Sequence, residues 1–567
     1  MPNILRISLA SKSSTLQALT GPDILLGGRA LTARFLRDEV PATCNPLGRH
    51  NKLIFAGGAL AGTLVSSVSR LSIGAKSPLT GGSKESNAGG VVAYKLGRMG
   101  IRAVIFEDRL PKEDGWIIVK IDTKGVSFEP AADMMGMGVY EKARLLAKRY
   151  GNNVGLALIG PAGEQCLVCA GIACTDPEGA PTRYSGRGGL GAVLASKGIL
   201  GVVIDDSQAP REDLADSAAF MEHLKRVADL VNTTPLTCDV FRKYGTAAMM
   251  DITNNIGALP VRNFSRGSFE LVHNIDGTAL HAAIAARGGE GNVSHACMRG
   301  CLIQCSNIYP DAHGRALVTP LEYETLGMLG ANCGIGDLDA IARLNYQCND
   351  MGVDTIDIGA AIAVAMEAGL APFGDTEFAQ KVITGIAEGA VLSRLIGSGA
   401  EITGKVLGVY RVPTVKGQAL AAYDPRAIKG TGVTYVTSPQ GADHTAGNTP
   451  RLQIKQHEKE GQVAHSRNAQ QGVALLDALG ICMMLGGAVK DMNLIISLIN
   501  ARFGTSFTLD EASMLALSTL AAEREFNVQA GITQAHNRAP EFFYEEMNPD
   551  SKSIFDFTEE ELAALHE

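Results

Sequence analysis

Three cysteines in one short segment carry the clearest chemistry in the sequence. The segment SHACMRGCLIQCSN places Cys297, Cys301 and Cys305 in a CxxxCxxxC pattern. Soft thiolates select iron-sulfur clusters or zinc, so this spacing predicts a metal centre. The same spacing would also put the three side chains on one face of a helix, and a helix with three small buried cysteines is the alternative. We favour the metal centre because Gly300 weakens a helix at this point.

A [4Fe-4S] cluster usually needs four thiolates, so one more cysteine must come from elsewhere in the chain. Our choice is Cys482 in LLDALGICMMLG, where Gly480 lets the backbone approach a cofactor and Asp477 can accept hydrogen bonds from a polar heterocycle. Spacing alone leaves Cys333 and Cys348 as alternatives. A second group, EQCLVCAGIACTD, also contains three cysteines, but its apolar strand-like pattern indicates structural residues.

The composition limits the class of protein. With 567 residues, 46% of them apolar, the chain is long enough for several buried cores. A net charge of −8 without a basic stripe argues against nucleic acid as a partner. No apolar run is long enough to span a bilayer, and an odd number of cysteines, eleven, suits a reducing compartment. We therefore expect a cytoplasmic protein with thiols or metal ligands and no membrane span.

Glycine is unusually frequent, with 65 residues. Because glycine permits close backbone approach, such an excess suggests a large ligand lying against main chain. The strip SKESNAGGVVAYKLG offers Asn87, Gly89 and Gly90 for holding a phosphate.

The elements that must position these residues form an α+β pattern. A β-rich domain is predicted for residues 1–208, a helical domain for 209–405 and a second helical domain for 406–567. Strands are expected at these apolar runs: 53–58, 103–108, 116–121, 154–160 and 201–206. Helices are expected near 214–231, 244–256, 335–352, 376–395, 484–503 and 509–525.

Nearly the whole chain resembles the tungsten-dependent aldehyde:ferredoxin oxidoreductases. The resemblance rests on an ordered set of phrases: NKLIFAGGALAGT, AKSPLTGG followed by NAGG, IGPAGE, GRGGLGAVLASK, KYGTAAMMDITNNIGALPVRNF, LEYETLGMLGANCGI, MGVDTIDIG and DALGIC. It implies a β-rich N-terminal base for a bis-pyranopterin and two mainly helical domains that cover it. The metal of that cofactor would be held by pterin sulfurs alone, so the sequence does not separate tungsten from molybdenum.

Two motifs of the type DxxGxxC/D embrace the pterins in that family. The second motif here begins at Asp477, passes through Gly480 and ends at Cys482, and the resemblance makes this cysteine the fourth cluster ligand. The first motif runs from Asn349 to Asp354, with asparagine in place of the leading acid. One hydrogen bond to a pterin is therefore expected to differ in kind.

The resemblance also assigns residues to the pterin phosphates. Arg70 and Arg183 would bind the phosphates, which suits the bidentate geometry of arginine. The carbonyl oxygens of Asn87 and Tyr184 would hold a bridging magnesium ion. Without the resemblance, both arginines are better explained as surface ion pairs.

Glu324 in LEYET and His444 in PQGADHTAGN match the family's active-site acid and histidine. A buried carboxylate usually has a raised pKa, and histidine titrates near neutrality, so this pair would handle protons. Without the resemblance, a lone histidine is more often structural.

The activity implied is oxidation of an aldehyde to a carboxylate, with electrons leaving through one [4Fe-4S] cluster to ferredoxin or a ferredoxin-like subunit. The alternatives are a reductive reaction on a carboxylate or acyl thioester within a larger complex, and a non-redox iron-sulfur protein. Two departures from the family pattern stand out: the cysteine triplet is one residue wider than usual, and Arg343 to Tyr346 replace the ExxH of an inter-subunit iron. Any homo-oligomer is thus expected to lack that iron.

Overall fold

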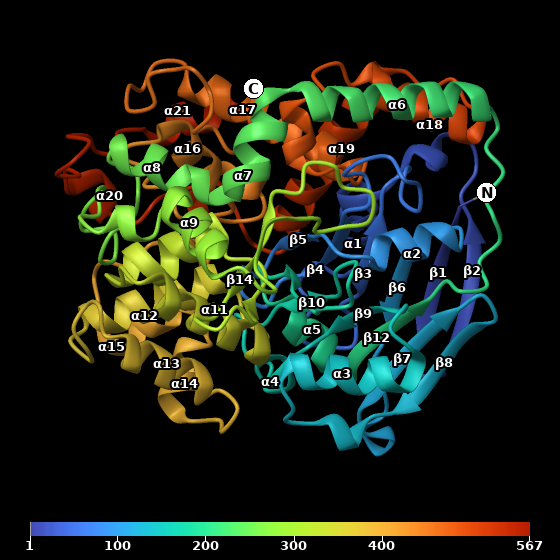
Figure 1. Cartoon of the computed structure of the whole chain (residues 1–567), viewed down its shortest axis with the longest axis horizontal. Coiled ribbons are helices and arrows are strands. Elements are labelled where there is room, and N and C mark those ends of the chain that lie inside the picture. Colours follow the sequence, from blue (N-terminus) through green and yellow to red (C-terminus); the bar gives the residue numbers. More distant parts are fainter. Residues whose placement is uncertain (1, 567) are drawn as a thin grey trace.

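A computed structural model describes residues 2–566 and shows a mixed α+β molecule. The strands of the N-terminal third, blue to green in Figure 1, lie on one side, and the helices of the rest cover them on the other. The expected β-rich base and mainly helical remainder are therefore confirmed. No helix within residues 2–566 has the length and apolar character required to cross a membrane.

Two six-stranded sheets, A and B, form the N-terminal part. Sheet A has the order β2 (Ser13–Ala18), β1 (Asn3–Ser8), β6 (Ile101–Glu107), β3 (Leu53–Gly57), β4 (Leu71–Lys76) and β5 (Ser83–Ala88). Sheet B has the order β11 (Arg183–Ser185), β10 (Ile172–Cys174), β9 (Gly155–Leu158), β12 (Ile199–Asp205), β7 (Ile117–Asp122) and β8 (Gly125–Pro130). Their central strands are continuous apolar runs because both faces are covered.

The sheets meet at one edge of each. Strand β5 ends sheet A, strand β11 ends sheet B, and the two lie side by side. Ser185 Oγ in β11 donates a hydrogen bond to the Ser86 carbonyl oxygen in β5 over 2.8 Å. The segments that carry Asn87 and Tyr184 are thereby brought together, although they are far apart in the sequence.

Seven α-helices are described before residue 245. They are α1 (Gly28–Glu39), α2 (Val92–Arg98), α3 (Val139–Tyr150), α4 (Pro161–Glu164), α5 (Leu190–Ser196), α6 (Ser217–Thr233) and α7 (Arg242–Tyr244). Helix α6 runs along one side of the molecule next to α18 (Figure 1). It begins after Asp216, whose side chain accepts a hydrogen bond from the Ala219 amide, which is a typical N-cap.

The remaining chain is mostly helical. Its helices are α8 (Met249–Asn255), α9 (Gly277–Arg287), α10 (Tyr323–Thr325), α11 (Leu338–Met351), α12 (Thr355–Glu367), α13 (Thr376–Thr384), α14 (Val391–Ile396), α15 (Gly399–Leu407), α16 (Lys429–Thr437), α17 (Gln462–Ala478), α18 (Asn493–Phe503), α19 (Leu509–Gln529), α20 (Phe542–Glu545) and α21 (Glu559–Ala563). Short strands β13 (Asn292–His295), β14 (Ser306–Pro310) and β15 (Ala316–Val318) form a three-stranded sheet, and β16 (Thr414–Val415) pairs with β17 (Gln418–Ala419).

Two expected helices differ from the structure. The single helix predicted over 376–395 is divided into α13 and α14, because Gly385 and Gly389 interrupt it and Gly389 has a positive φ of 68°. The helix predicted from 484 begins only at Asn493, after a glycine-containing 3-10 turn. A single apolar core also includes residues on both sides of 405, so the boundaries 1–208, 209–405 and 406–567 stay predictions.

A buried ion pair joins α1 to α19. The Arg29 guanidinium donates to both Glu523 carboxylate oxygens at 2.8 Å, and both side chains are 1% exposed. We expect Arg29→Met to lower the free energy of unfolding by about 3–5 kcal/mol, because Glu523 is left as an unpaired buried charge. Urea denaturation of the apo-protein measures this.

The control is Arg34→Met on the same helix, which removes an ion pair to Asp23 whose side chains are 42% and 44% exposed. That change should cost about 1 kcal/mol or less. Equal losses for the two variants would contradict the assignment of a structural role to the Arg29 pair.

Candidate site at the meeting of the sheet edges

The three clustered cysteines lie in a loop between β13 and β14, not in a helix. The loop turns at Gly300, which has a positive φ of 80°. The alternative of a helix with three buried cysteines is therefore wrong, because the chain reverses between the two strands. Cys301 is buried, while Cys297 and Cys305 keep some accessible surface.

Cys482 comes to the same place from the end of α17. Its amide donates to the Ser67 carbonyl oxygen over 2.8 Å, and Ser67 Oγ lies 3.5 Å from Cys301 Sγ. Cys297 and Cys301 act on each other's pKa, and the pKa of Cys305 is raised by burial and then by Cys297, Glu322 and Cys482. The structure thus gathers all four predicted ligand residues.

The spacing of these thiols fits a cluster better than a single ion. Four sulfurs around one zinc at about 2.3 Å would lie about 3.8 Å apart. Among the described residues, no three of these four sulfurs lie within 4.8 Å of one another. The wider arrangement suits a larger inorganic core.

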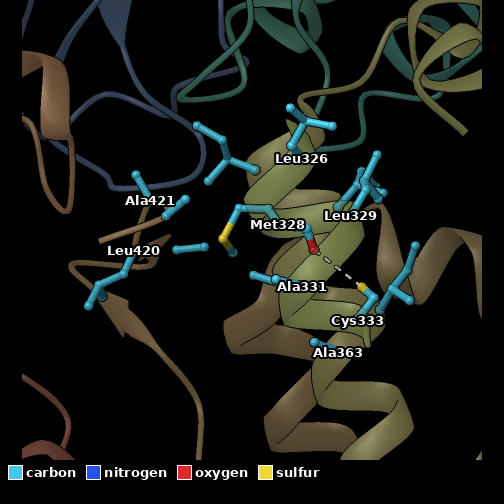
Figure 2. Packing of buried hydrophobic residues seen from close by; sticks show 14 of the residues in the cluster. Leu326, Met328, Leu329, Ala331, Cys333, Ala363, Leu420 and Ala421 are labelled. Atoms are coloured by element: carbon cyan, nitrogen blue, oxygen red, sulfur yellow. Dashed lines mark hydrogen bonds between the residues drawn. The ribbon is translucent and has the colours of Figure 1, made fainter. Parts of the chain in front are cut away.

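The alternative fourth ligands lie elsewhere. Cys333 and Cys348 are fully buried in the apolar core of the helical part. Cys333 Sγ donates to the Met328 carbonyl oxygen over 3.3 Å, and Figure 2 shows it surrounded by leucine and alanine side chains. Neither cysteine is therefore available to the loop that holds Cys297.

The first predicted phosphate arginine lies beside this thiol group. Arg70 Nη2 donates to the Asn87 carbonyl oxygen over 3.1 Å, and its Nε donates to the Asn87 side chain. A Cβ on Gly89 would lie 3.3 Å from Cys297 Sγ and 3.4 Å from Arg70 Nη1. Gly90 donates its amide to the Cys297 carbonyl oxygen over 2.8 Å. The glycine strip therefore lies directly against the cysteine loop.

The second predicted phosphate arginine is held by a chain of polar side chains. Arg183 donates to Ser306 Oγ at 2.8 Å and to His295 Nδ1 at 2.9 Å, and His295 Nε2 lies 2.8 Å from Glu178 Oε2. Since a guanidinium only donates, Nδ1 must accept, so Nε2 carries the proton given to Glu178. Arg183 Nε is buried without a partner among the described residues.

The first predicted pterin motif lies on the other side of β11. The Tyr184 hydroxyl donates to the Asn349 carbonyl oxygen, and Asn349 Nδ2 donates to the Tyr140 hydroxyl over 3.3 Å. Asp354 caps α12 by accepting the Asp357 amide over 3.0 Å. Asp354 also has a structural role that the sequence pattern did not indicate.

In the second motif, the Gly480 carbonyl oxygen accepts the Arg70 amide over 3.1 Å, which links the motif to the first phosphate arginine. Asp477 lies 3.4 Å from Arg29. Burial, and then the nearby Glu85 carboxylate, raise the pKa of Asp477 well above its usual range.

Glu324 and His444 form the predicted pair. His444 Nε2 lies 3.2 Å from Glu324 Oε1, but not in line for a hydrogen bond, and Glu324 Oε2 accepts the Ala422 amide over 2.8 Å. Burial raises the pKa of Glu324, and His444 opposes that shift. Glu324 Oε1 and His444 Nδ1 therefore have hydrogen-bonding capacity to spare.

A cavity of about 130 Å³ adjoins this pair. Its lining combines Glu324 and His444 with one further acid, Glu322, and with mainly apolar side chains. Glu322 accepts a hydrogen bond from Thr246, and its pKa is raised by burial. After burial and the nearer charges, the Glu322 carboxylate also raises the pKa of Cys305 and of Cys482, so one acid of the cavity lining lies near these thiols.

Four residues of the site were not predicted from the sequence. Glu322 stands two residues before Glu324, His295 two residues before Cys297, and Arg187 inside the glycine phrase GRGGLG. Asp443 precedes His444 and pairs with the buried Lys84. The sequence indicates these residues only by their position next to predicted site residues. Sequence spacing does not show which neighbouring side chain points into the site.

Several buried polar atoms around the site have no hydrogen-bond partner among the described residues. They are Arg183 Nε, Arg187 Nε, Glu324 Oε1, Gln418 Nε2 and Oε1, Tyr435 Oη and His444 Nδ1. Such atoms are costly in a folded protein unless a ligand or water meets them. They fit a large polar cofactor, as do the glycine strips.

Family models match almost the whole chain. The model described as "Aldehyde ferredoxin oxidoreductase, N-terminal domain" matches residues 4–206, and the one described as "Aldehyde ferredoxin oxidoreductase, domains 2 & 3" matches residues 222–565.

Among curated relatives, the tungsten-containing aldehyde ferredoxin oxidoreductase of Pyrococcus furiosus is 30% identical over 93% of this chain and 88% of its own. The enzyme of that description from Thermococcus kodakarensis is 31% identical with the same coverage. The aliphatic sulfonate oxidoreductase WOR-like subunit of P. furiosus is 25% identical over 74% of this chain and 70% of its own.

A solved structure, the active site complex BamBC of benzoyl coenzyme A reductase with 1,5 dienoyl-CoA, aligns with a TM-score of 0.79. It is 19% identical and covers 99% of this chain and 92% of that chain. At this identity the likeness concerns the fold alone.

His295 is expected to fix the orientation of Arg183 toward a phosphate. Replacing it with alanine removes the acceptor at 2.9 Å, so we expect retention of the phosphate-bearing pterin to fall by roughly tenfold. The readout is pterin released per chain from anaerobically purified protein. His295→Gln, which can still accept a hydrogen bond, should retain more pterin, and equal pterin contents for wild type and His295→Ala would refute this role.

Proposed function

The chain belongs to the aldehyde ferredoxin oxidoreductase family, and on that premise we propose that it oxidises an aldehyde to the carboxylate. One aldehyde and one water yield one carboxylate, two electrons and three protons. The single observation that carries the proposal is the Glu324 and His444 pair, 3.2 Å apart beside a cavity whose lining includes Met483, the residue after Cys482.

The proposed cofactor is a tungsten or molybdenum bis-pyranopterin, which when bound accepts the two electrons of the oxidation. Arg70 and Arg183 would bind its phosphates, and the Asn87 and Tyr184 carbonyl oxygens would hold magnesium. The adjacent edges of the two sheets and the unpaired Arg183 Nε support this assignment.

The pterin rings would be bound by the two glycine-containing motifs. Asp477 and Gly480 serve one pterin, Asn349 and Asp354 serve the other, and Gly89 and Gly90 leave room for the phosphates. Asn349 donates through its amide where the family's acid accepts. One pterin contact therefore has the opposite hydrogen-bond polarity.

We assign a [4Fe-4S] cluster to Cys297, Cys301, Cys305 and Cys482. The wide separation of their sulfurs supports a cluster over a single zinc ion. One cluster holds one electron at a time, so an external electron acceptor must collect the pair. A ferredoxin or ferredoxin-like subunit is the proposed acceptor.

The protein groups would handle the protons. His444 would donate to the carbonyl oxygen of the aldehyde, which orients and polarises it, and Glu324 would accept a proton from the attacking water or the hydrate. The raised pKa of Glu324 makes it a stronger base once deprotonated.

An anaerobic assay with aldehydes and an artificial dye tests the proposed reaction. Dye reduction that depends on the aldehyde, with formation of the matching carboxylate, is expected. If the loaded protein reduces no dye with any aldehyde but transfers electrons to an acyl thioester, the aldehyde assignment is wrong.

Cys482→Ala should remove the cluster, because Cys482 is the proposed fourth ligand beside the three loop cysteines. The expected result is loss of the EPR signal of the reduced cluster and most of the iron. Cys348→Ala is the matched control, since that thiol lies in the apolar core. Retention of the cluster in Cys482→Ala, or its loss in Cys348→Ala, would count against the ligand assignment.

The pH dependence of kcat/KM should report Glu324. A base must be deprotonated, so a raised pKa moves the acid limb of the profile above the ordinary glutamate value of about 4.3. His444→Gln should lower the rate and shift this limb upward, because a charge that favours the carboxylate is lost.

The other groups that act on Glu324 stay in place in this variant: Arg187 and the Ala422 amide lower its pKa, and Asp354 raises it. His281→Gln, outside the cavity, is the control. An unchanged acid limb in His444→Gln would exclude Glu324 as the titrating base.

A further inference from the structure

The cavity beside Glu324 and His444 has one arginine in its lining, Arg451. Its guanidinium carbon lies 5.3 Å from the centroid of the Phe241 ring, and its Nη1 lies 3.8 Å from Met484 Sδ. Phe241 and Met484 line the same cavity. The cation is therefore held against the apolar wall of the cavity, and its exposure to solvent marks the outer end.

Arg451 has no acidic partner. Within residues 2–566, no carboxylate oxygen lies within 4.0 Å of its guanidinium. By contrast, the buried arginines Arg29, Arg187 and Arg502 each pair with an acid. A guanidinium with free donors at the entrance of a cavity is suited to a planar anion, which it binds through two parallel hydrogen bonds.

The charges in the cavity are separated along its length. Glu322 and Glu324 are enclosed, and Arg451 is exposed. The rest of the lining is mostly apolar or aromatic and includes Met249, Tyr423 and Met483, and the charges of Glu324 and Arg451 both act on Tyr423. An anionic group would be repelled at the inner end and attracted at the outer end, so a substrate with one anionic end would bind with its other end inward.

We propose that the substrate is an aldehyde that carries a carboxylate at the end remote from the carbonyl, and that Arg451 binds this carboxylate. This inference rests on the proposed function for the reaction itself. A monoanionic carboxylate is favoured over a dianionic phosphate because the cavity offers one arginine and already contains two acids. The product is then a dicarboxylate.

The test compares two aldehydes of similar length, 4-oxobutanoate and pentanal, with anaerobically prepared holoenzyme. The wild type should prefer 4-oxobutanoate in kcat/KM. Arg451→Met should lose roughly 10- to 100-fold in kcat/KM for 4-oxobutanoate, the worth of a charge-assisted contact, and change little for pentanal. Arg451→Lys should recover part of the preference.

Lys243→Met is the matched control. Lys243 is an exposed cation that lies 4.9 Å from the Tyr244 ring centroid, two residues from Phe241, and it does not line the cavity. This variant should leave both rates unchanged. A wild type without preference for 4-oxobutanoate, or equal losses for both aldehydes in Arg451→Met, would overturn the proposal.

Calorimetry separates this inference from the proposed reaction. If neither aldehyde is oxidised, the proposed function fails, but binding of succinate and of the uncharged succinamide still tests the anion site. Succinate binding that is stronger than succinamide binding and is lost in Arg451→Met but not in Lys243→Met supports the site. Equal binding of succinate and succinamide, or succinate binding that survives in Arg451→Met, contradicts it.

Discussion

Two close main-chain contacts, each between a pair of glycines, fix the positions of the segments that form the site. Gly480, with φ of 68°, touches Gly58 at the end of β3, where a Cβ on Gly58 would lie 1.9 Å from the Leu479 carbonyl oxygen. Gly352, with φ of 77°, touches Gly160 after β9 in the same way, because a Cβ on Gly352 would lie 2.6 Å from the Gly160 amide nitrogen. Each sheet is thereby joined to one of the two DxxGxx motifs. No larger residue allows main chains to approach so closely.

This constraint explains why distant segments share one interior space. The contact at Gly480 places Cys482 beside the loop of Cys301, and the contact at Gly352 places Asp354 within 3.5 Å of Arg187. Arg187 is also 3.9 Å from Asp443, the neighbour of His444. Buried charges are costly unless paired, so these contacts define the positions of both the cysteine loop and the Glu324 and His444 pair.

The sequence predicted much of this arrangement, for physical reasons. Continuous apolar runs identified the central strands, and the resemblance identified Cys482 and His444. The prediction of one helix over 376–395 was wrong because glycines interrupt a segment whose apolar residues keep helical periodicity. Strand β5 was not predicted because its sequence, SKESNA, is polar, although the strand is almost entirely buried. Its buried Lys84 is paired with Asp443 across the fold, a long-range contact that no local pattern contains.

The site residues differ in how well the sequence predicted them. Cysteines are rare and closely spaced, so they stood out, whereas Glu322 and His295 are ordinary residue types whose orientation depends on tertiary structure. The same holds for Arg451, whose significance comes from the cavity wall behind it. Roles that depend on residue type could be predicted from the sequence, whereas roles that depend on the orientation of a side chain could not.

We propose that thiols from two distant segments bind one iron-sulfur cluster beside a pterin-bound metal. Metal and pterin analysis of anaerobically purified protein tests this proposal most directly. About four iron atoms, about one tungsten or molybdenum atom and about two pterins per chain are expected. Protein that contains zinc or a single iron atom per chain, with no pterin, would contradict it.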